Sequence, residues 1–193
     1  MKKITFIGLG VMGFPMAGHL SKKGYEVVVL DLYIYGKEVF DNLRPNHKLI
    51  EFAGDIRNAK MAKKAMHECD VVIHLACISN DPSYDLNPDL GRSINYDSFR
   101  PLIHAAKKAG VKRFIYASSS SVYGLKDEDE VTEDLPLEPL TDYSKYKALC
   151  EQILEEEREP SFISCIIRPS TVCGYAPRQR LDVVVNILTN HAV

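Results

Sequence analysis

The chain has 193 residues, of which 46% are hydrophobic and 26% charged, and its formal net charge at neutral pH is −2. A chain of this length is expected to form one domain, and its balanced charge gives no general attraction for nucleic acid or an anionic membrane, so neither is an expected partner. The five cysteines lack metal-binding spacing, which predicts reduced thiols and no metal site. The apolar start is broken by glycines, which predicts neither a leader nor a membrane span. A cytoplasmic location is therefore expected.

Short apolar runs alternate with longer amphipathic stretches along the chain. Runs rich in Val, Ile and Phe predict strands, and apolar residues at helical spacing predict helices. The predicted strands are 3–8, 26–31, 48–54, 70–76, 113–119 and 162–169, and the predicted helices are 11–23, 37–43, 58–68, 93–109, 141–157 and 181–191. This alternation predicts an α/β fold, a doubly wound parallel Rossmann sheet with strand order 3-2-1-4-5-6 that binds ligands at the carboxyl ends of its strands.

The first predicted strand runs into a G-x-G-x-x-G turn at the head of a predicted helix. Gly8 suits the tight turn, Gly10 lets the backbone approach a pyrophosphate, and Gly13 permits close packing of helix and strand. Val11 and Met12 lie in the first helical turn, where backbone N–H groups can bind phosphate. The segment therefore predicts dinucleotide binding.

Asp31 ends the second predicted strand, 23 residues after Gly8. A carboxylate at this place can accept hydrogen bonds from both hydroxyls of an adenosine ribose. It would also repel a 2′-phosphate, and the following Leu32 and Tyr33 bring no cation to hold one. NAD is therefore predicted as the cofactor in preference to NADP.

Six later motifs follow one another in the order GDIRN, VVIHLAC, SINYDS, FIYASSSSVYG, YSKYK and IIRPSTVCG. On these motifs the chain, from about residue 31 onward, resembles the extended short-chain dehydrogenase/reductase family of NAD-dependent sugar-nucleotide epimerases and dehydratases. The resemblance implies catalysis by Ser119, Tyr143 and Lys147, although only the count back from Tyr123 separates Ser119 from its neighbouring serines. The resemblance further implies cofactor contacts from Asp55, Ile56, Leu75, Ala76, Cys77, Asn95, Tyr143, Lys147 and Pro169.

The spacing of Tyr143 and Lys147 suits proton transfer, because helical residues four apart share a face. Half ionisation of a tyrosine near pH 7 requires its pKa of about 10 to fall by roughly 3 units, or about 4 kcal/mol. A cation about 5 Å away supplies roughly 3 kcal/mol, and an oxidised nicotinamide adds a second positive charge. Tyr143 is predicted to act as the general base while hydride passes to NAD, with Ser119 hydrogen-bonded to the same substrate oxygen.

Two features depart from the family. Its usual GGxGxxG opening would require glycine in place of Ile7, whereas residues 1–31 resemble the amino terminus of the 3-hydroxyisobutyrate and 6-phosphogluconate dehydrogenases. The chain also stops soon after the sixth predicted strand, where family members continue into a substrate segment. We interpret residues 1–193 as a single NAD-binding domain with the substrate domain largely missing. We further interpret the chain as an engineered hybrid of a hydroxyacid-type unit (1–31) and a short-chain-type unit (32–193). Natural divergence is the alternative.

Three functions follow in order of preference. The first is an NAD-binding domain with little or no turnover, because the pocket for a substrate is expected to be incomplete. The second is an active NAD-dependent sugar-nucleotide oxidoreductase or epimerase, with a sugar nucleotide as a further partner. The third, from residues 1–31 alone, is an NAD-dependent hydroxyacid dehydrogenase. Apolar surface near the end of the chain additionally predicts association into a homodimer.

Overall fold

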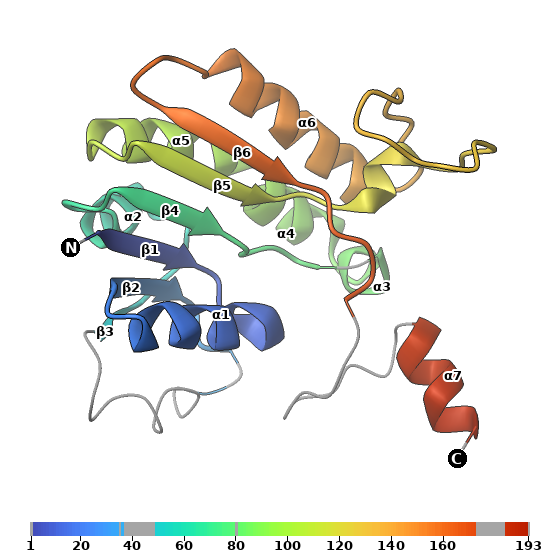
Figure 1. Ribbon diagram of the computed structural model, residues 1–193, viewed down its shortest axis with the longest axis horizontal. Helices are drawn as coiled ribbons and strands as arrows, with labels where there is room; N and C mark the ends of the chain where they lie inside the picture. The colour runs from blue at the N-terminus through green and yellow to red at the C-terminus, as the bar shows by residue number, and fades with distance from the viewer. Residues whose placement is uncertain (1, 35, 37–48, 80, 173–183, 193) are drawn as a thin grey trace.

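The computed structural model describes residues 2–34, 36, 49–79, 81–172 and 184–192. Figure 1 shows a single twisted sheet with helices on both of its sides. The helix expected near residues 37–43 lies outside the described residues.

The sheet has six parallel strands in the order β3-β2-β1-β4-β5-β6. The strands are β1 (Lys3–Ile7), β2 (Glu26–Asp31), β3 (Leu49–Ala53), β4 (Val71–His74), β5 (Arg113–Ala117) and β6 (Ile163–Ile167). This order confirms the predicted doubly wound Rossmann sheet. The chain reverses its direction of travel across the sheet between β1 and β4, and ligands of such sheets bind beyond the carboxyl ends of the strands at this point.

The helices are α1 (Gly10–Lys22), α2 (Ala59–Ala65), α3 (Asp81–Asp85), α4 (Pro88–Arg92), α5 (Phe99–Lys108), α6 (Asp142–Glu156) and α7 (Val184–Ala192). A π-helical turn spans Ser93–Asp97, and a 3-10 turn spans Ser120–Tyr123. The single helix expected over 93–109 is therefore divided into the π-helical turn and α5. The helix expected over 141–157 forms as α6.

Two apolar layers cover the two faces of the sheet. On one face α2, α5 and α6 pack against side chains such as Val28, Val72 and Phe114. On the other face α1 covers β1 and β2, where Phe6 and Val27 are fully buried. Strands that are buried on both faces read as continuous apolar runs, which explains the sequence EVVVLD of β2.

The edge strand β6 is less well covered than the centre of the sheet. Its Ile166 packs into the layer formed by α2, α5 and α6. Side chains alternate between the faces of a strand, so Ile163 and Ile167 point to the α1 side, where they are 51% and 50% exposed. The α1 side of the sheet is thus closed over β1 and β2 and partly open over β6.

No helix in the described part of the chain has both the length and the apolar character needed to cross a bilayer. Among these residues, three or more His, Cys, Asp or Glu side chains nowhere gather in a way that could hold a metal ion. Cys69, Cys77, Cys150 and Cys165 carry free thiols. Cys173 lies outside the described residues.

Candidate functional site

The residues expected to bind cofactor or perform chemistry gather at one edge of the sheet. Because the strands are parallel, the segments that follow them all emerge along this edge. Gly8 follows β1, Asp31 ends β2, Asp55 follows β3, Cys77 follows β4, Ser119 follows β5 and Pro169 follows β6. The fold therefore brings the predicted site together.

The glycine turn is shaped by close contacts and by its backbone conformation. Gly8 has a φ of +84°, and a Cβ at this position would overlap the backbone of Ala76 after β4. A Cβ at Gly13 would lie 2.6 Å from the carbonyl oxygen of Gly8. Gly10, with a φ of +50°, has no atom within 4 Å of the place where a Cβ would lie. Two glycines thus close the turn, and the third leaves the amino end of α1 accessible, as a bound pyrophosphate requires.

The carboxylate of Asp31 is held beside the glycine turn. Its Oδ2 accepts a hydrogen bond of 2.7 Å from the backbone N–H of Leu9, and its Oδ1 accepts one of 2.6 Å from that of Tyr33. Each carboxylate oxygen has a further lone pair, so these bonds fix the side chain without exhausting its capacity for ribose hydroxyls. The arrangement fits the adenosine side of a dinucleotide.

The segment after β3 lies next to Asp31, because the Gly54 amide donates to the Asp31 carbonyl at 2.9 Å. The side chain of Asp55 is engaged by Arg57, whose backbone N–H and Nε lie 2.8 and 3.0 Å from Oδ1. These hydrogen bonds hold the pKa of the Asp55 carboxyl below its usual value. Ile56 is 8% exposed and packs in the core. Contacts of these two residues with adenine stay predictions.

The segment after β4 is fixed against the glycine turn from two directions. The amides of Leu75 and Ala76 both donate to the carbonyl of Ile7 at 2.8 Å. Asn95, from the π-helical turn, accepts from the amide of Ile78 at 2.8 Å and donates to its carbonyl at 3.0 Å. Asn95 therefore positions this segment through the main chain, which places the half-buried Cys77 at the site.

Tyr143 and Lys147 lie one turn apart on α6, whose first turn is fixed by a capping box between Thr141 and Ser144. Lys147 is 4% exposed, and its Nζ donates to the carbonyl of Ala117 at the end of β5, at 2.6 Å. The same Nζ lies 5.8 Å from the centroid of the Tyr143 ring.

The environment of Lys147 favours its charged form. Burial opposes the charge, but the neighbouring Cys77, Tyr143 and Cys150 side chains outweigh that cost and raise the pKa of Lys147. An ammonium ion thus lies beside Tyr143.

The four consecutive serines differ in their surroundings. Ser118 is buried, and its hydroxyl donates to the carboxylate of Glu151 on α6. Ser119 is half-buried, and its Oγ accepts from the amide and the hydroxyl of Ser121 at 3.2 and 2.8 Å. Ser118 is therefore engaged in the interior, whereas Ser119 is accessible at the carboxyl end of β5.

His74, at the end of β4, is a buried side chain that packs among aromatic rings. Its ring stacks with Phe99 and Tyr116 at centroid distances of 5.7 and 5.8 Å. Desolvation lowers the pKa of His74 to about 3, and its Nδ1 has no hydrogen-bond partner among the described residues. The ring is therefore neutral and aromatic in character, which argues against a role as acid or base.

Sequence reasoning missed the ion pair of Glu151 and Arg168, in which Nη2 and Oε2 lie 2.7 Å apart and the carboxylate also accepts from the hydroxyl of Ser118. The available signal was the position of Glu151, one turn beyond Lys147 on the same helix face. Its partner, 17 residues further on, gave no such signal.

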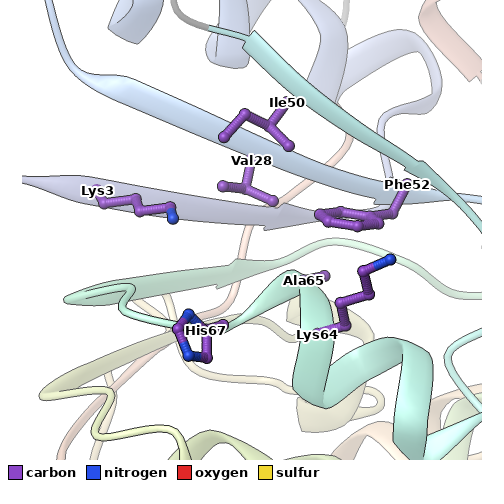
Figure 2. A pocket seen from close by; sticks show the side chains of 7 residues that line it. All are labelled: Lys3, Val28, Ile50, Phe52, Lys64, Ala65 and His67. Carbon is purple, nitrogen blue, oxygen red and sulfur yellow. The ribbon is translucent and has the colours of Figure 1, made fainter.

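A separate cavity of about 240 Å³ lies between β2, β3 and α2 (Figure 2). Its lining side chains are Lys3, Val28, Ile50, Phe52, Lys64, Ala65 and His67. Lys3 begins β1, whereas the glycine turn follows the end of that strand. The residues that line the cavity do not include any of the predicted site residues.

Comparison with known proteins identifies relatives over nearly the whole chain. The profile of the family described as "NAD dependent epimerase/dehydratase family" matches residues 8–192. Sterol-4-alpha-carboxylate 3-dehydrogenase, decarboxylating, from Mus musculus is 30% identical over 191 residues, which cover 96% of this chain and 50% of that enzyme. UDP-glucose 4-epimerase from Lactobacillus helveticus is 31% identical over 157 residues, which cover 80% of this chain and 46% of the relative.

Solved structures show the same fold. UDP-N-acetylglucosamine 4-epimerase from Methanobrevibacter ruminantium, in complex with UDP-N-acetylmuramic acid, has a TM-score of 0.84 at 27% identity over 98% of this chain and 63% of its own. MoeE5 in complex with UDP-glucose and NAD has a TM-score of 0.80 at 27% identity over 96% of this chain and 59% of its own.

The chain spans about half the length of the curated relatives it matches. The match to the family includes the glycine turn, the end of β5 and the Tyr143–Lys147 pair, which are also the residues that the fold gathers at one edge. The chain therefore belongs to the NAD-dependent epimerase/dehydratase family.

Proposed function

We propose that this chain binds NAD and carries the cofactor-binding domain and catalytic side chains of an enzyme that oxidises a secondary hydroxyl group of a sugar nucleotide. One observation carries the proposal. Tyr143 and Lys147 share a face of α6, and Lys147 is anchored to the end of β5 next to Ser119, at the same sheet edge as the glycine turn.

The residues at this edge suit the parts of a dinucleotide. The glycine turn and the first turn of α1 would hold the pyrophosphate, and Asp31 would hold the ribose hydroxyls. The segment after β4, together with Lys147 and Pro169, would line the rest of the dinucleotide. Bound NAD would supply the acceptor for a hydride.

The side chains of α6 and β5 would move the proton. The Lys147 ammonium lies 5.8 Å from the centroid of the Tyr143 ring, and a unit charge at that distance would stabilise a tyrosinate by about 3 kcal/mol at an effective dielectric constant of 20. The Tyr143 oxygen would then accept the proton of the substrate hydroxyl, while Ser119 donates a hydrogen bond to the same oxygen.

The relatives support the class of substrate at two levels. One set of names describes epimerases of UDP-sugars and another a dehydrogenase of sterols, so oxidation of an alcohol is the chemistry that they suggest in common. A sugar nucleotide is favoured because the structural neighbours at TM-scores of 0.84 and 0.80 were solved with UDP-sugars.

NAD binding with little or no turnover by residues 1–193 alone is the second candidate, since the relatives are about twice as long. The hybrid origin of residues 1–31 and a hydroxyacid dehydrogenase activity stay predictions. Exchange of residues 1–31 for a GGxGxxG unit tests whether the two kinds of unit are interchangeable, as the hybrid interpretation requires. Retained folding and NAD binding would support interchangeable units, and their loss would contradict it.

Calorimetric titration with NAD and NADP tests the cofactor assignment. We expect NAD to bind at least about tenfold more tightly than NADP, and Asp31→Ala to weaken NAD binding about tenfold because charge-assisted hydrogen bonds are lost. Asp129→Ala, an exposed acidic residue of a loop, is the matched control and should leave both affinities unchanged. Equal affinities in the wild type would contradict the role of Asp31.

NADH formation, or conversion of the sugar nucleotide where the hydride returns to the product, tests the catalytic assignment with UDP-glucose, UDP-N-acetylglucosamine and a 3β-hydroxysteroid. Tyr143→Phe should lower kcat by about 10²- to 10⁴-fold with NAD affinity within about threefold, because only the proton acceptor is removed. Tyr146→Phe is the control on the same helix, since its ring packs 5.9 and 5.2 Å from Tyr84 and Tyr96. A wild type that binds NAD without turning over any of these substrates would favour the second candidate.

A further inference from the structure

A charged side chain lies inside the protein on the helix face that carries Tyr143 and Lys147. Glu151 is 4% exposed and lies one turn beyond Lys147 on α6. Arg168 donates to its carboxylate from Nε at 3.1 and 3.2 Å and from Nη2 at 2.7 Å, and the Ser118 hydroxyl also donates to it. The guanidinium fork matches the carboxylate, so the buried charge is compensated by several directed hydrogen bonds.

Arg168 links this carboxylate to two further segments. It follows β6 by one residue, and its Nη1 donates to the hydroxyl of Tyr123 at 2.7 Å and to the carbonyl of Glu133 at 3.4 Å. Its guanidinium carbon lies 5.0 Å from the centroid of the Tyr123 ring. One side chain thereby joins α6, the end of β6, the 3-10 turn and the loop that contains Glu133.

The residues on both sides of Ser119 are held by these elements. From β6, the carbonyls of Ile167 and Pro169 accept from the amides of Ser118 and Ser120 at 2.8 and 3.0 Å. From α6, Lys147 donates to the carbonyl of Ala117, and Glu151 accepts from the hydroxyl of Ser118. The hydrogen bonds of Ser119 itself are local: its Oγ accepts from Ser121, and its carbonyl accepts from the amide of Val122 at 3.3 Å. The place of Ser119 is therefore set by its neighbours.

We propose that Glu151, held by Arg168, is a positioning residue that fixes Ser119 relative to Tyr143 and Lys147. Helix α6 carries Tyr143 and Lys147, and it is hydrogen-bonded to the end of β5, which is followed by Ser119. The contact between Glu151 and Ser118 therefore sets the distance from Ser119 to the two side chains of α6. The proposal rests on the proposed function for the roles of Ser119 and Tyr143. The placement of Ser119 is nevertheless measurable without turnover.

Hydrogen exchange of the Ser120 amide, followed by NMR in the whole chain, reports that placement directly. We expect Glu151→Gln and Ser118→Ala each to accelerate this exchange at least about tenfold, while the amide of Val72 in β4 keeps its protection, because the opening is local. Ser118→Ala leaves the Glu151–Arg168 pair intact, so it decides the question if Glu151→Gln does not fold. Unchanged exchange at Ser120 in Ser118→Ala would overturn the proposal.

Glu157→Gln is the matched control. Glu157 follows α6 directly and pairs with Lys107 and Arg100 of α5, away from the site. It should lower the stability of the protein without accelerating exchange at Ser120.

A double-mutant cycle with Ser119→Ala tests the effect on the reaction. Glu151→Gln should lower kcat about tenfold or more, with KM and NAD affinity within about threefold, and should have no further effect on kcat in the Ser119→Ala background. A general structural role would instead give effects that multiply, and that result would also overturn the proposal. A wild type without NAD binding would contradict the proposed function and leave the exchange result at Ser120 to decide the role of Glu151.

Discussion

At Gly8 both the backbone conformation and the available space exclude a side chain. Gly24 has nearly the same φ, +86° against +84°, but no atom lies within 4 Å of its hypothetical Cβ. The two positions therefore separate the cost of a positive φ from the cost of a steric overlap.

Gly8→Ala is expected to destabilise the protein by more than Gly24→Ala. The positive φ costs about 1–2 kcal/mol in either variant, and the overlap with Ala76 adds about 1–3 kcal/mol at Gly8 alone. Urea unfolding measures the difference, and NAD titration should show weakened binding only in Gly8→Ala. Equal unfolding free energies in the two variants would mean that the turn can relax away from Ala76.

Single residues were predictable where chemistry follows from neighbours in the sequence. The glycine turn, Asp31 and the Tyr143–Lys147 spacing each depend on short-range patterns, and the structure brings them to one edge. Glu151 was not predictable in this way. Its partners Ser118 and Arg168 lie 33 residues before it and 17 residues after it, so its burial emerges only when β5, α6 and β6 meet.

At the scale of elements, α5 and the end of α6 are joined by one carboxylate with three nitrogen-bearing partners. Glu157 lies 2.9 Å from Lys107 Nζ, 3.0 Å from His104 Nε2 and 2.8 Å from Arg100 Nη1. The hydrogen bonds from Lys107 and His104 lower the pKa of Glu157 to about 2 from an ordinary value of 4.5. The ionised form is therefore favoured by folding.

The depressed pKa gives a defined loss of stability in acid. The contribution of Glu157 is fully present above about pH 4.5 and is lost as the pH falls toward 2. Glu157→Gln should lower the free energy of unfolding by about 1 kcal/mol at neutral pH, because the pairs are partly solvated, and the difference should vanish near pH 2. Urea unfolding across this range measures it, with Glu130→Gln in an exposed loop as control. If the difference in unfolding free energy between Glu157→Gln and the wild type does not change with pH, the loss of stability comes from packing and not from the charge of Glu157.

The strands followed closely from periodicity, whereas the short helices α3 and α4 were not predicted. The strands form within one or two residues of their predicted bounds, because buried parallel strands are continuous apolar runs. The segment 93–109 has a helical pattern throughout, yet it opens with a π-helical turn. In that turn the side chain of Asn95 is hydrogen-bonded to the main chain of Ile78, which follows β4. Local sequence patterns do not predict this contact.

At the scale of the whole molecule, β6 and α7 carry several of the exposed large apolar side chains. Ile163 and Ile167 are 51% and 50% exposed, and Val184 and Leu188 are 67% and 63% exposed. Exposed apolar surface of this kind favours association, and an edge strand adds unpaired backbone groups. The homodimer expected from the sequence stays a prediction.

Light scattering over a range of concentrations tests that prediction. The mass should rise toward that of two chains, and Ile163→Lys should shift the chain toward a monomer because it places a charge on the edge strand. Leu86→Lys is the control, since Leu86 is 87% exposed and lies between α3 and α4. A strictly monomeric wild type at high concentration would contradict association through this surface.

The hydrogen bonds between α6 and the end of β5 also restrict where residues can be inserted or deleted. Tyr143, Lys147 and Glu151 succeed one another at intervals of four residues, and each added or deleted residue would turn the following part of the helix by about 100°. An insertion between Tyr143 and Glu151 would therefore rotate the Glu151 carboxylate away from Ser118, while Tyr143 would keep its position. Insertions can be absorbed in the exposed segment 127–131, which precedes the Glu133 carbonyl that Arg168 contacts.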